Sequence, residues 1–578
     1  MLAWKIGGDQ GEGIDSTGDV LATVANRMGY YVYGYKHFSS RIRGGHTNYK
    51  VRIATSRVEA TTRRTDILVA LNQETIDRNV HELEGGLILA DESFSPVLPE
   101  GADAHLLTLP LTNIARSLGS IMMRNMVAVG ASAALIQLPL DAFVDYVTVK
   151  FEKKGEAVVN ANREAVTTGY QRVIDEYRAL LTFKLGDPSR GDRLVITGND
   201  AIALGAIAGG CRLMYGYPIT PATEIMEALV RWFPSVGGAV VQMEDELGSI
   251  TAVIGAGFAG ARAMTSSSGP GISLMQEAMG LASVAEIPAV IVDTQRGGPS
   301  TGMPTKQEQS DLLALLHGGH GDTLRVVLTP GSVEECFEDA VEAFNLAEQF
   351  QTPVIIATDL SLALWKQSVE RKSLNGPNVS IRKGSTLSPE DLLALGENVF
   401  QRYQFSPDGI SPRSLPGEKN GQYLATGVEH GPSGKVSEDP ANRERMMNKR
   451  LTKLLGVAAI RDGFRYEGPD HPELILVGIG STVGILREAL HHLRGQVGLG
   501  WFRTLSPFPV DRVQSVLAPA KHIMVVEQNA LGQIRQLMAA HGVSDDRFTS
   551  YLKYDGVPFL PEEVVTRAMS LLSPVEVH

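Results

Sequence analysis

Short apolar runs alternate along this chain with segments whose apolar residues recur at helical spacing. The runs have the length of buried strands and are bounded by glycine, proline or polar residues. They occupy residues 67–71, 86–90, 194–198, 287–293, 353–359, 474–479 and 523–527. Helices are expected at 16–28, 122–137, 200–210, 252–263 and after Ala222. Because strands that alternate with helices form layered sheets, the predicted fold class is α/β with several open sheets.

Changes in composition divide the chain into four predicted segments. A length of 578 residues exceeds what one hydrophobic core organises, which favours several domains. Residues 371–450 are rich in glycine, proline, serine and charge, apart from a short helix expected at 389–403. Such a stretch is usually functional or disordered. The predicted domains are 1–185, 190–370 and 451–578, with 371–450 as an extended strap or linker.

Composition and charge exclude several classes of protein. A hydrophobic content of 43% and a charged content of 20% describe an ordinary globular protein. The net charge of −12, with no basic block to offset it, argues against nucleic-acid binding. No window approaches the roughly 20 apolar residues of a membrane span, and the first residues lack the apolar core of a signal peptide. A cytoplasmic location without membrane contact is therefore expected.

Cys211 and Cys336 are the only cysteines in the sequence. Two thiolates cannot hold an iron–sulfur cluster that needs four ligands. A disulfide is not expected in a cytosolic protein, so both side chains are predicted to pack in the core. If the reaction transfers electrons to an iron–sulfur centre, that centre lies on another polypeptide.

The sequence Gly-Tyr-Pro-Ile-Thr-Pro at 216–221 precedes an amphipathic helix. Each proline fixes its own φ and biases the preceding residue towards an extended conformation. We expect a rigid turn that holds the hydroxyl of Thr220 at its apex. An isolated turn of this kind is more often structural, so its meaning depends on the motifs that follow.

Three further polar segments follow apolar strands in the same region. Glu244, Asp245 and Glu246 stand where a strand gives way to a Gly/Ala-rich helix. N-capping explains Glu244 and Asp245, whereas Glu246 falls inside the first turn. A flexible, hydroxyl-rich loop is expected at 265–271, and the strand at 287–293 leads into a polar loop at 294–305. Polar loops at the carboxyl ends of successive strands indicate the ligand-binding edge of an open α/β sheet.

Three of these motifs together resemble the α subunit of the 2-oxoacid:ferredoxin oxidoreductases. They are Tyr-Pro-Ile-Thr-Pro at 217–221, Glu-Asp-Glu at 244–246 and Thr-Gln-Arg-Gly-Gly-Pro-Ser-Thr-Gly at 294–302. The resemblance covers essentially the whole chain. Residues 1–185 look like the γ subunit of the family, fused ahead of the α part, and 451–578 resemble the C-terminal domain of transketolase-like enzymes. The fused layout is most similar to the enzymes that act on 2-oxoglutarate.

The family also contains the 371–450 segment, which favours an ordered strap over a flexible linker. Arg413 and His430 would then be structural residues or interface residues. The sequence leaves this choice open.

The resemblance implies thiamine diphosphate as cofactor, coenzyme A as acyl acceptor and ferredoxin as electron acceptor. Glu246 matches the glutamate that contacts N1′ of the aminopyrimidine ring, and Gly269 is a further candidate for binding the cofactor. The Gly-Asp-Gly and Asn arrangement that holds the diphosphate through Mg²⁺ is not found in the sequence. The chain therefore resembles half of the site, and no metal ligand is assigned to it. A β subunit would carry Mg²⁺, a [4Fe-4S] cluster and the rest of the thiamine diphosphate site, in an (αβ)₂ assembly.

Four residues are predicted to bind the 2-oxoacid. Arg296 can make a charge-assisted contact to the carboxylate that leaves as carbon dioxide, with an interface salt bridge as the alternative. Thr220 and Thr305 carry hydroxyls suited to the 2-oxo group, although Thr305 is as readily the N-cap of a following helix. Tyr217 completes the set. Catalytic roles are assigned to Glu246, Arg296 and Thr220.

The second carboxylate of 2-oxoglutarate needs a cation or several donors of its own. Lys306 and Arg262 are candidates for that cation, and either is as readily a surface residue. The partner subunit is the third possible source of the cation.

A glycine-rich loop with Gly8, Gly11 and Gly13 lies between the opening strand and the first helix. Such a loop can present N–H groups to a phosphate of a bound cofactor. The spacing departs from G-x-G-x-x-G, and Asp9 and Glu12 would repel an anion, so a tight structural turn is the alternative.

Arg41, Arg43 and His46 frame a Gly-Gly pair, an arrangement that suits a bound diphosphate. The resemblance gives this domain a part in handling coenzyme A, which makes these three residues candidates. The alternative is that these cations are solvated on the exposed face of a strand.

The predicted function is thus the α subunit of an enzyme that converts 2-oxoglutarate and coenzyme A to succinyl-CoA and CO₂, or catalyses the reverse carboxylation. A pyruvate-acting or broad-range member of the same family is one alternative. A thiamine dehydrogenase that uses NAD without an iron–sulfur centre is another. A non-catalytic nucleotide-binding or scaffold subunit is the alternative from a different class.

Overall fold

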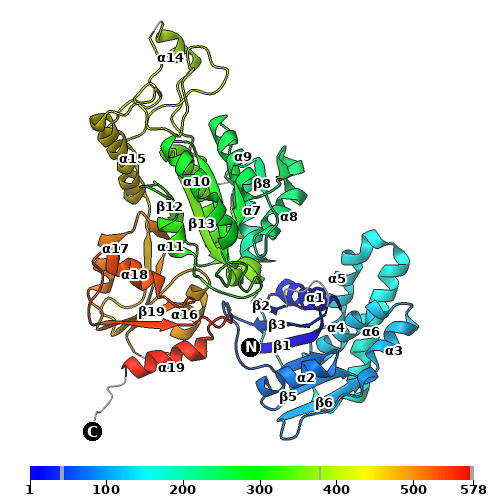
Figure 1. The fold of residues 1–578 in the computed structure, drawn as a ribbon. Helices are drawn as coiled ribbons and strands as arrows, with labels where there is room; N and C mark the ends of the chain where they lie inside the picture. Colours follow the sequence, from blue (N-terminus) through cyan, green and yellow to red (C-terminus); the bar gives the residue numbers. More distant parts are fainter. Residues whose placement is uncertain (39–43, 190, 377–378, 397, 494, 573–578) are drawn as a thin grey trace, which may run out of the picture. The chain divides into compact units, whose positions relative to one another are not determined.

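The computed structural model describes residues 1–38, 44–189, 191–376, 379–396, 398–493 and 495–572. The chain forms two compact units, each with its own sheets and helices (Figure 1). Unit 1 comprises Met1–Ile196, Trp365–Ser373 and Leu560–Glu562, and unit 2 comprises Thr197–Leu364, Leu374–Phe559 and Glu563–His578. The predicted α/β class with several open sheets is confirmed, whereas the division into four domains stays a prediction.

Unit 1 contains an eight-stranded mixed sheet in the order β6-β5-β4-β1-β3-β2-β14-β7. Its strands are β1 (Leu2–Asp9), β2 (Tyr31–His37), β3 (His46–Ala54), β4 (Ile67–Ala70), β5 (Gly86–Asp91), β6 (Ala104–Leu109), β7 (Arg193–Ile196) and β14 (Gln367–Glu370). The strand expected at 194–198 is therefore β7, which pairs with β14 in this sheet.

Helices of unit 1 cover both faces of that sheet. They are α1 (Ile14–Arg27), α2 (Gln73–Asn79), α3 (Leu111–Ser117), α4 (Arg124–Leu135), α5 (Leu140–Phe151) and α6 (Glu156–Glu176). Of these, α2 packs on the face of Leu68 and Ile88, and the other helices pack on the opposite face. The buried helix expected at 122–137 is confirmed as α4, which lies beside α6 (Figure 1). A Cβ on Gly130 would stand 1.9 Å from the carbonyl oxygen of Val166, so only glycine permits this approach of the two backbones.

Unit 2 contains a seven-stranded sheet in the order β18-β12-β13-β11-β10-β8-β9. Its strands are β8 (Leu213–Gly216), β9 (Ala239–Gln242), β10 (Ala263–Ser267), β11 (Ala289–Gln295), β12 (Val326–Leu328), β13 (Pro353–Asp359) and β18 (Thr504–Ser506). The helices interleaved with them are α7 (Gly198–Ala208), α8 (Thr223–Trp232), α9 (Glu246–Phe258), α10 (Gly269–Val284), α11 (Leu312–His317), α12 (Val333–Phe350) and α13 (Leu360–Leu364). β8 to β13 pair in parallel, so their carboxyl ends share one edge.

A five-stranded sheet in the order β15-β17-β16-β19-β20 completes unit 2. Its strands are β15 (Phe464–Glu467), β16 (Leu474–Gly478), β17 (Val497–Phe502), β19 (His522–Glu527) and β20 (Phe548–Leu552). The last helices of the chain are α16 (Thr482–Leu490), α17 (Val510–Leu517), α18 (Gln533–Ala540) and α19 (Pro561–Leu572). Ile250 and Met275 belong to the same buried cluster as Ile475 and Val525, so the two sheets share one core.

The described part of the strap at 371–450 makes side-chain contacts with the rest of unit 2. Its helix expected at 389–403 is shorter, α14 (Pro389–Ala394), because Gly396 takes a φ of 61° beyond the helix end. A second helix, α15 (Pro440–Ile460), continues through residue 450, where the strap was expected to end. The strap contacts the core through Arg413, which donates from Nη1 to the carbonyl of Gly257 at 2.8 Å.

A buried ion cluster attaches α15 to the end of α10. Glu286 follows α10 and accepts hydrogen bonds from Lys449, at 2.7 Å, and from Lys453. Burial lowers the pKa of Lys453 to about 7, although Glu286 opposes this shift. His430 lies 4.1 Å from the ring of Tyr403 and is fully buried. These contacts favour the structural interpretation of Arg413 and His430.

Cys211 and Cys336 are fully buried and unpaired, which confirms their predicted place in the core. No helix in the described part of the chain has the length and apolarity that a bilayer crossing needs.

Candidate active site

The three motifs converge on one edge of the seven-stranded sheet. The turn that contains Thr220 follows β8, Glu246 begins α9 after β9, Gly269 begins α10 after β10, and Arg296 follows β11. Because these neighbouring strands are parallel, all four segments leave the sheet at their carboxyl ends. The sheet order therefore brings together residues that lie up to 76 positions apart in sequence.

Glu246 is the first residue of α9 and is 7% exposed. Asp245 is the N-cap, and its carboxylate accepts from the backbone N–H of Gly248 at 2.7 Å, which confirms the capping role predicted for it. Glu246 is thus not needed as the cap. A Cβ on Gly271 would lie 2.8 Å from Oε1 of Glu246 and 2.0 Å from Oγ of Ser267. The carboxylate and the hydroxyl meet above the first turn of α10.

The segment 265–271 differs from the flexible loop that was expected. Residues 265–267 form the end of β10, and 269–271 are the first turn of α10. α9 likewise ends at Phe258, ahead of the expected 263. Small hydroxyl side chains fit inside a parallel sheet that is covered on both faces, which explains why Thr265, Ser267 and Ser268 are buried. Their three hydroxyls have no hydrogen-bond partner among the described residues.

Arg296 is buried beside the turn that contains Thr220. Its Nη1 donates to the backbone carbonyl of Thr220 at 2.5 Å, and its Nη2 reaches the carbonyl of Thr301 at 3.5 Å. Nε has no partner in the described structure, and burial lowers the pKa of the guanidinium. Arg296 and Thr220 are thus in contact, through the backbone carbonyl of Thr220. The remaining donor capacity of Arg296 suits an anion.

Thr305 and Tyr217 lie on the loops that flank this arginine. Thr305 is half-buried in a turn, and the next helix, α11, begins only at Leu312 with Asp311 before it. The alternative that Thr305 caps the following helix is therefore wrong. Tyr217 follows β8 and is 42% exposed.

The two candidate cations for a distal carboxylate occupy different places. Arg262 precedes β10, at the amino end of the strands, and donates to the carbonyls of Gly209 and Arg382, both at 2.6 Å. It lies at the opposite edge of the sheet from Arg296, which excludes it. Lys306 is half-buried, and burial lowers its pKa. A Cβ on Gly556 would stand 2.9 Å from the Cβ of Lys306, so Lys306 packs against the 555–557 loop.

Sequence reasoning missed a pair of carboxyl groups behind Arg296. Asp293 lies on β11 and is fully buried, and Asp311 precedes α11. The signal was available, because Asp293 is a charged residue inside an apolar run. Among the described residues, no group of three or more His, Cys, Asp or Glu residues could hold a metal ion.

In unit 1, the glycine-rich loop bonds mostly to itself. Oε2 of Glu12 accepts from the backbone N–H of Asp9 at 2.8 Å, and its Oε1 pairs with Arg124 at 2.7 Å. Gly11 and Gly13 take positive φ values of 98° and 79°. A Cβ on Gly8 would stand 2.6 Å from Oε2 of Glu12. A carboxylate of the chain thus takes the N–H group that a phosphate would need, which favours the tight structural turn.

A pocket of about 240 Å³ in unit 1 contains His46. Both ring nitrogens of His46 and Oδ1 of Asn48 are buried without a hydrogen-bond partner in the described structure. Burial lowers the pKa of His46 to about 4, so the ring is neutral at neutral pH. Lys5, Arg78 and Glu82 also line the pocket. Arg41 and Arg43 lie outside the described residues.

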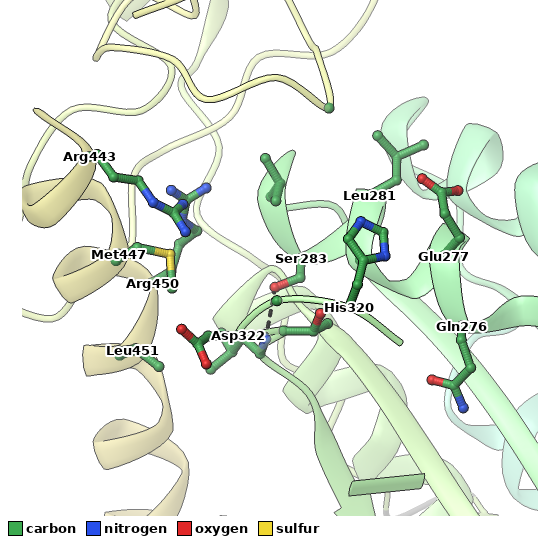
Figure 2. A pocket seen from close by; sticks show the side chains of 16 residues that line it. Gln276, Glu277, Leu281, Ser283, His320, Asp322, Arg443, Met447, Arg450 and Leu451 are labelled. Atoms are coloured by element: carbon green, nitrogen blue, oxygen red, sulfur yellow. Dashed lines mark hydrogen bonds between the residues drawn. The ribbon is translucent and has the colours of Figure 1, made fainter. Parts of the chain in front are cut away.

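A second pocket, of about 210 Å³, lies at the other end of α10 from Gly269 (Figure 2). Its lining includes His320 and Asp322 as well as Arg443 and Arg450 of α15 (Figure 2). Both arginines donate to Glu429, Arg450 at 2.6 Å and Arg443 at 2.5 Å. The single carboxylate of Glu429 therefore neutralises one of the two positive charges.

Comparisons with known proteins identify the family. The family described as "Pyruvate flavodoxin/ferredoxin oxidoreductase, thiamine diP-bdg" matches residues 204–449, which include Thr220, Glu246 and Arg296. "Pyruvate ferredoxin/flavodoxin oxidoreductase" matches 3–172, and "Pyruvate:ferredoxin oxidoreductase core domain II" matches 472–564. "2-oxoacid:ferredoxin oxidoreductase 2, subunit alpha" of Aeropyrum pernix is 34% identical, over 99% of this chain and 98% of its own. The chain belongs to the 2-oxoacid:ferredoxin oxidoreductase α subunits.

Two further relatives extend the comparison. "2-oxoglutarate oxidoreductase subunit KorA" of Mycobacterium tuberculosis is 30% identical over 97% of this chain and 90% of its own. A solved structure, "2-oxoglutarate:ferredoxin oxidoreductase from Magnetococcus marinus with 2-oxoglutarate, coenzyme A and succinyl-CoA bound", is 36% identical, covers 99% of both chains and superposes with a TM-score of 0.91. The resemblance stated from the three motifs is confirmed. The chain is part of an oxidoreductase that acts on 2-oxoacids with ferredoxin as acceptor, and its second segment is of the thiamine diphosphate-binding type.

Replacing Gly271 by alanine should disturb this site, because the new Cβ would collide with Ser267 and Glu246. Overpacking of this kind costs about 1–3 kcal/mol and would displace the carboxylate. Gly255→Ala is the matched control on α9, since a Cβ there meets nothing within 4 Å. Calorimetric unfolding and turnover of both variants check the prediction. Equal behaviour of the two variants would contradict it.

Proposed function

We propose that this chain supplies the aminopyrimidine side of a thiamine diphosphate site and the arginine that binds the substrate carboxylate, in an enzyme for 2-oxoglutarate. One observation carries the proposal. A buried glutamate, three unpaired hydroxyls and an arginine with an unpaired Nε converge on one sheet edge of a chain in this family.

The residues at this edge fit the cofactor. Glu246 offers a buried carboxylate at a helix start, and the glycines at 269 and 271 let Asp311, Ser267 and Glu246 approach the start of α10 closely. The unpaired hydroxyls of Thr265, Ser267 and Ser268 provide donors and acceptors that a protein normally satisfies. When bound, thiamine diphosphate supplies a thiazolium carbon that adds to the 2-oxo group and accommodates the electron pair left by CO₂. Glu246 would hold the proton shared with N1′, and Gly269 would contact the cofactor.

Arg296 would bind and orient the carboxylate of the substrate. Its Nη1 is fixed by the carbonyl of Thr220, so the guanidinium is held in one orientation while Nε remains available. The hydroxyls of Thr220 and Thr305 would donate to the 2-oxo oxygen, where negative charge develops. Tyr217 would close the exposed side of the substrate, since its ring is partly exposed on the same loop.

A β subunit would complete the site. Cys211 and Cys336 are buried in the core and cannot ligate a cluster, which supports placing the [4Fe-4S] cluster and Mg²⁺ on the partner. Exposed apolar side chains surround the site at Tyr217, Val241 and Leu247. They suit coverage by another chain. We infer an (αβ)₂ assembly that passes electrons to ferredoxin.

Unit 1 would take part in binding coenzyme A. The neutral, unpaired ring of His46 and the amide oxygen of Asn48 give its pocket polar groups without partners. Arg41 and Arg43 would pair with phosphates from the adjoining segment. Gly8, Gly11 and Gly13 are weaker candidates, because Glu12 takes up the N–H of Asp9.

The substrate proposed is 2-oxoglutarate. The Magnetococcus marinus structure is named for this acid and contains it, and the Mycobacterium relative carries the same name. In this chain, Lys306 lies beside Thr305 and is the candidate that stands near enough in sequence to pair with the second carboxylate. Relatives named only for 2-oxoacids support the broad-range alternative.

Glu246→Gln in the complex with the partner subunit should suppress turnover while assembly persists, because the amide cannot exchange the proton with N1′. The expected loss is about 10²–10⁴-fold, the scale of general acid–base contributions. Glu244→Gln, on an exposed neighbour, is the matched control.

Arg296→Ala should also raise KM, because it removes a substrate contact. Near wild-type kinetics in both site variants would refute the assignment.

The isolated chain should be colourless and inactive, because its two cysteines cannot hold a cluster and the diphosphate motif is missing. Co-expression with a partner that contains Cys-x-x-Cys and Gly-Asp-Gly should yield a brown complex that reduces ferredoxin or viologen. Absorption spectra and 2-oxoacid-dependent reduction measure both states. Full activity of the lone polypeptide would overturn the division of the site.

The complex should prefer 2-oxoglutarate over 2-oxobutyrate and pyruvate in kcat/KM with coenzyme A. A site that pairs a second carboxylate leaves its own polar groups unpaired when that carboxylate is missing, which costs affinity. Lys306→Met should reduce this preference if Lys306 is the cation. Equal kcat/KM values for the three acids would establish a broad-range enzyme, and a preference for pyruvate would rule out the substrate proposed.

A further inference from the structure

The carboxyl groups of Asp293 and Asp311 lie near Arg296, and the proposed function gives them no role. Asp293 is fully buried on β11, and neither of its oxygens has a hydrogen-bond partner among the described residues. Asp293 stands in register with Ser267 of β10. A carboxyl group without donors in such a place is costly when ionised.

Asp311 is the second member of the pair. Its Oδ2 and Oδ1 lie 2.7 and 2.8 Å from the place where a Cβ of Gly269 would stand, so it covers the first residue of α10. Its backbone N–H donates to Oε1 of Gln295 at 3.0 Å, which fixes it beside the end of β11. Oδ2 has no partner in the described structure.

Each element that packs against Asp311 contributes its own charged or neutral groups. β11 contributes Asp293, the residue after the strand is the cationic Arg296, and the loop of Asp311 itself contributes Glu308. The first turn of α10 contains only uncharged residues, and α18 contributes the neutral Gln533. One cation therefore faces three carboxyl groups.

The pKa shifts of the two carboxyl groups indicate that the pair holds one proton. Burial, and then the charge of Asp311, raise the pKa of Asp293 well above its usual range. Burial and Glu308 raise the pKa of Asp311 to about 6, while Arg296 opposes the shift. Two interacting carboxyl groups titrate as a pair, and the second ionisation is the costly one. At neutral pH, Asp293 holds the proton and Asp311 carries the charge that faces Arg296.

We propose that Asp311, backed by the neutral Asp293, couples binding of the substrate carboxylate at Arg296 to the uptake of one proton. This rests on the proposed role of Arg296. The charge of Asp311 balances the guanidinium while no substrate is present. An anion that binds Arg296 stands near that charge, and protonation of Asp311 removes the repulsion. Asp311 is a positioning residue, since it acts through Arg296 and the electrostatic field around it.

The sign of the pH dependence follows from linkage. As pH rises through about 6, Asp311 loses its proton in the free enzyme, whereas the bound anion raises its pKa. Binding above that pH therefore requires a proton. The KM for 2-oxoglutarate should rise with pH, by at most about tenfold per unit, until the pKa of the bound state is reached.

The experiment compares KM and kcat of the wild-type complex and of Asp311→Asn between about pH 6 and pH 8. The variant should show a low KM that no longer depends on pH, because its neutral amide neither repels the anion nor titrates. Asp293→Asn is the matched control and should keep the wild-type profile, since an amide replaces a carboxyl group that is already neutral. A KM that is higher in Asp311→Asn at every pH would overturn the proposal.

A binding measurement provides a second readout. Calorimetric titration of the wild-type complex with N-oxalylglycine, a 2-oxoglutarate analogue, in two buffers of different ionisation enthalpy gives the number of protons taken up. We expect uptake approaching one proton above about pH 7, and none in Asp311→Asn. No uptake by the wild type overturns the proposal, even if the variant fails to fold. Arg296→Gln separates the two assignments: if its KM is unchanged, the proposed role of Arg296 fails, whereas a raised KM without proton uptake in the wild type refutes the coupling alone.

Discussion

Burial of the Asp359 carboxyl group at the end of β13 is the constraint on which the arrangement of the site depends. Its Oδ2 accepts from Nε2 of Gln309 and from the backbone N–H of Ser481, both at 2.8 Å, and its Oδ1 accepts from the N–H of Leu362 at 3.1 Å. These donors come from the loop after β11, the start of α16 and α13. Burying a polar group without hydrogen-bond partners costs roughly 2–7 kcal/mol. Because Asp359 is buried, its need for these donors holds the three segments together.

Gln307 extends this network towards the residues proposed to bind substrate. Its Oε1 accepts from the N–H and the hydroxyl of Ser361 at 2.8 and 2.7 Å, and its Nε2 donates to Oε1 of Gln528 at 3.1 Å. The loop 296–311 is thus fixed at its start by the contact of Arg296 with Thr220 and at its end by Gln307 and Gln309. The C-terminal sheet, to which sequence reasoning gave no catalytic part, therefore positions Thr305 and Lys306 through backbone and amide contacts.

Local patterns in the sequence predicted the elements, and parallel-sheet geometry predicted the convergence of Thr220, Glu246 and Arg296. The features that the sequence did not predict depend on contacts between distant segments of the chain. β7 is a strand of four residues whose partner β14 lies more than 170 positions later, and nothing in its own sequence indicates that pairing. The hydroxyl-rich segment 265–271 has the composition of a loop, yet the core buries it as strand and helix. Asp311 lies near Asp293 because the hydrogen bonds of Gln307 and Gln309 fix the loop 296–311, and the sequence does not indicate those contacts.

The site carries polar groups whose cost the surrounding structure must offset. Each buried group without a partner costs about 1–3 kcal/mol, and Thr265, Ser267, Ser268 and Nε of Arg296 all belong to this class among the described residues. They separate by charge: the neutral hydroxyl of Ser267 lies beside Glu246, and the cation lies beside Thr220. A polar uncharged ring on one side and an anionic acid on the other would satisfy both groups. A pair of ligands with these properties fits the proposed chemistry, in which Glu246 meets the ring and Arg296 meets the acid.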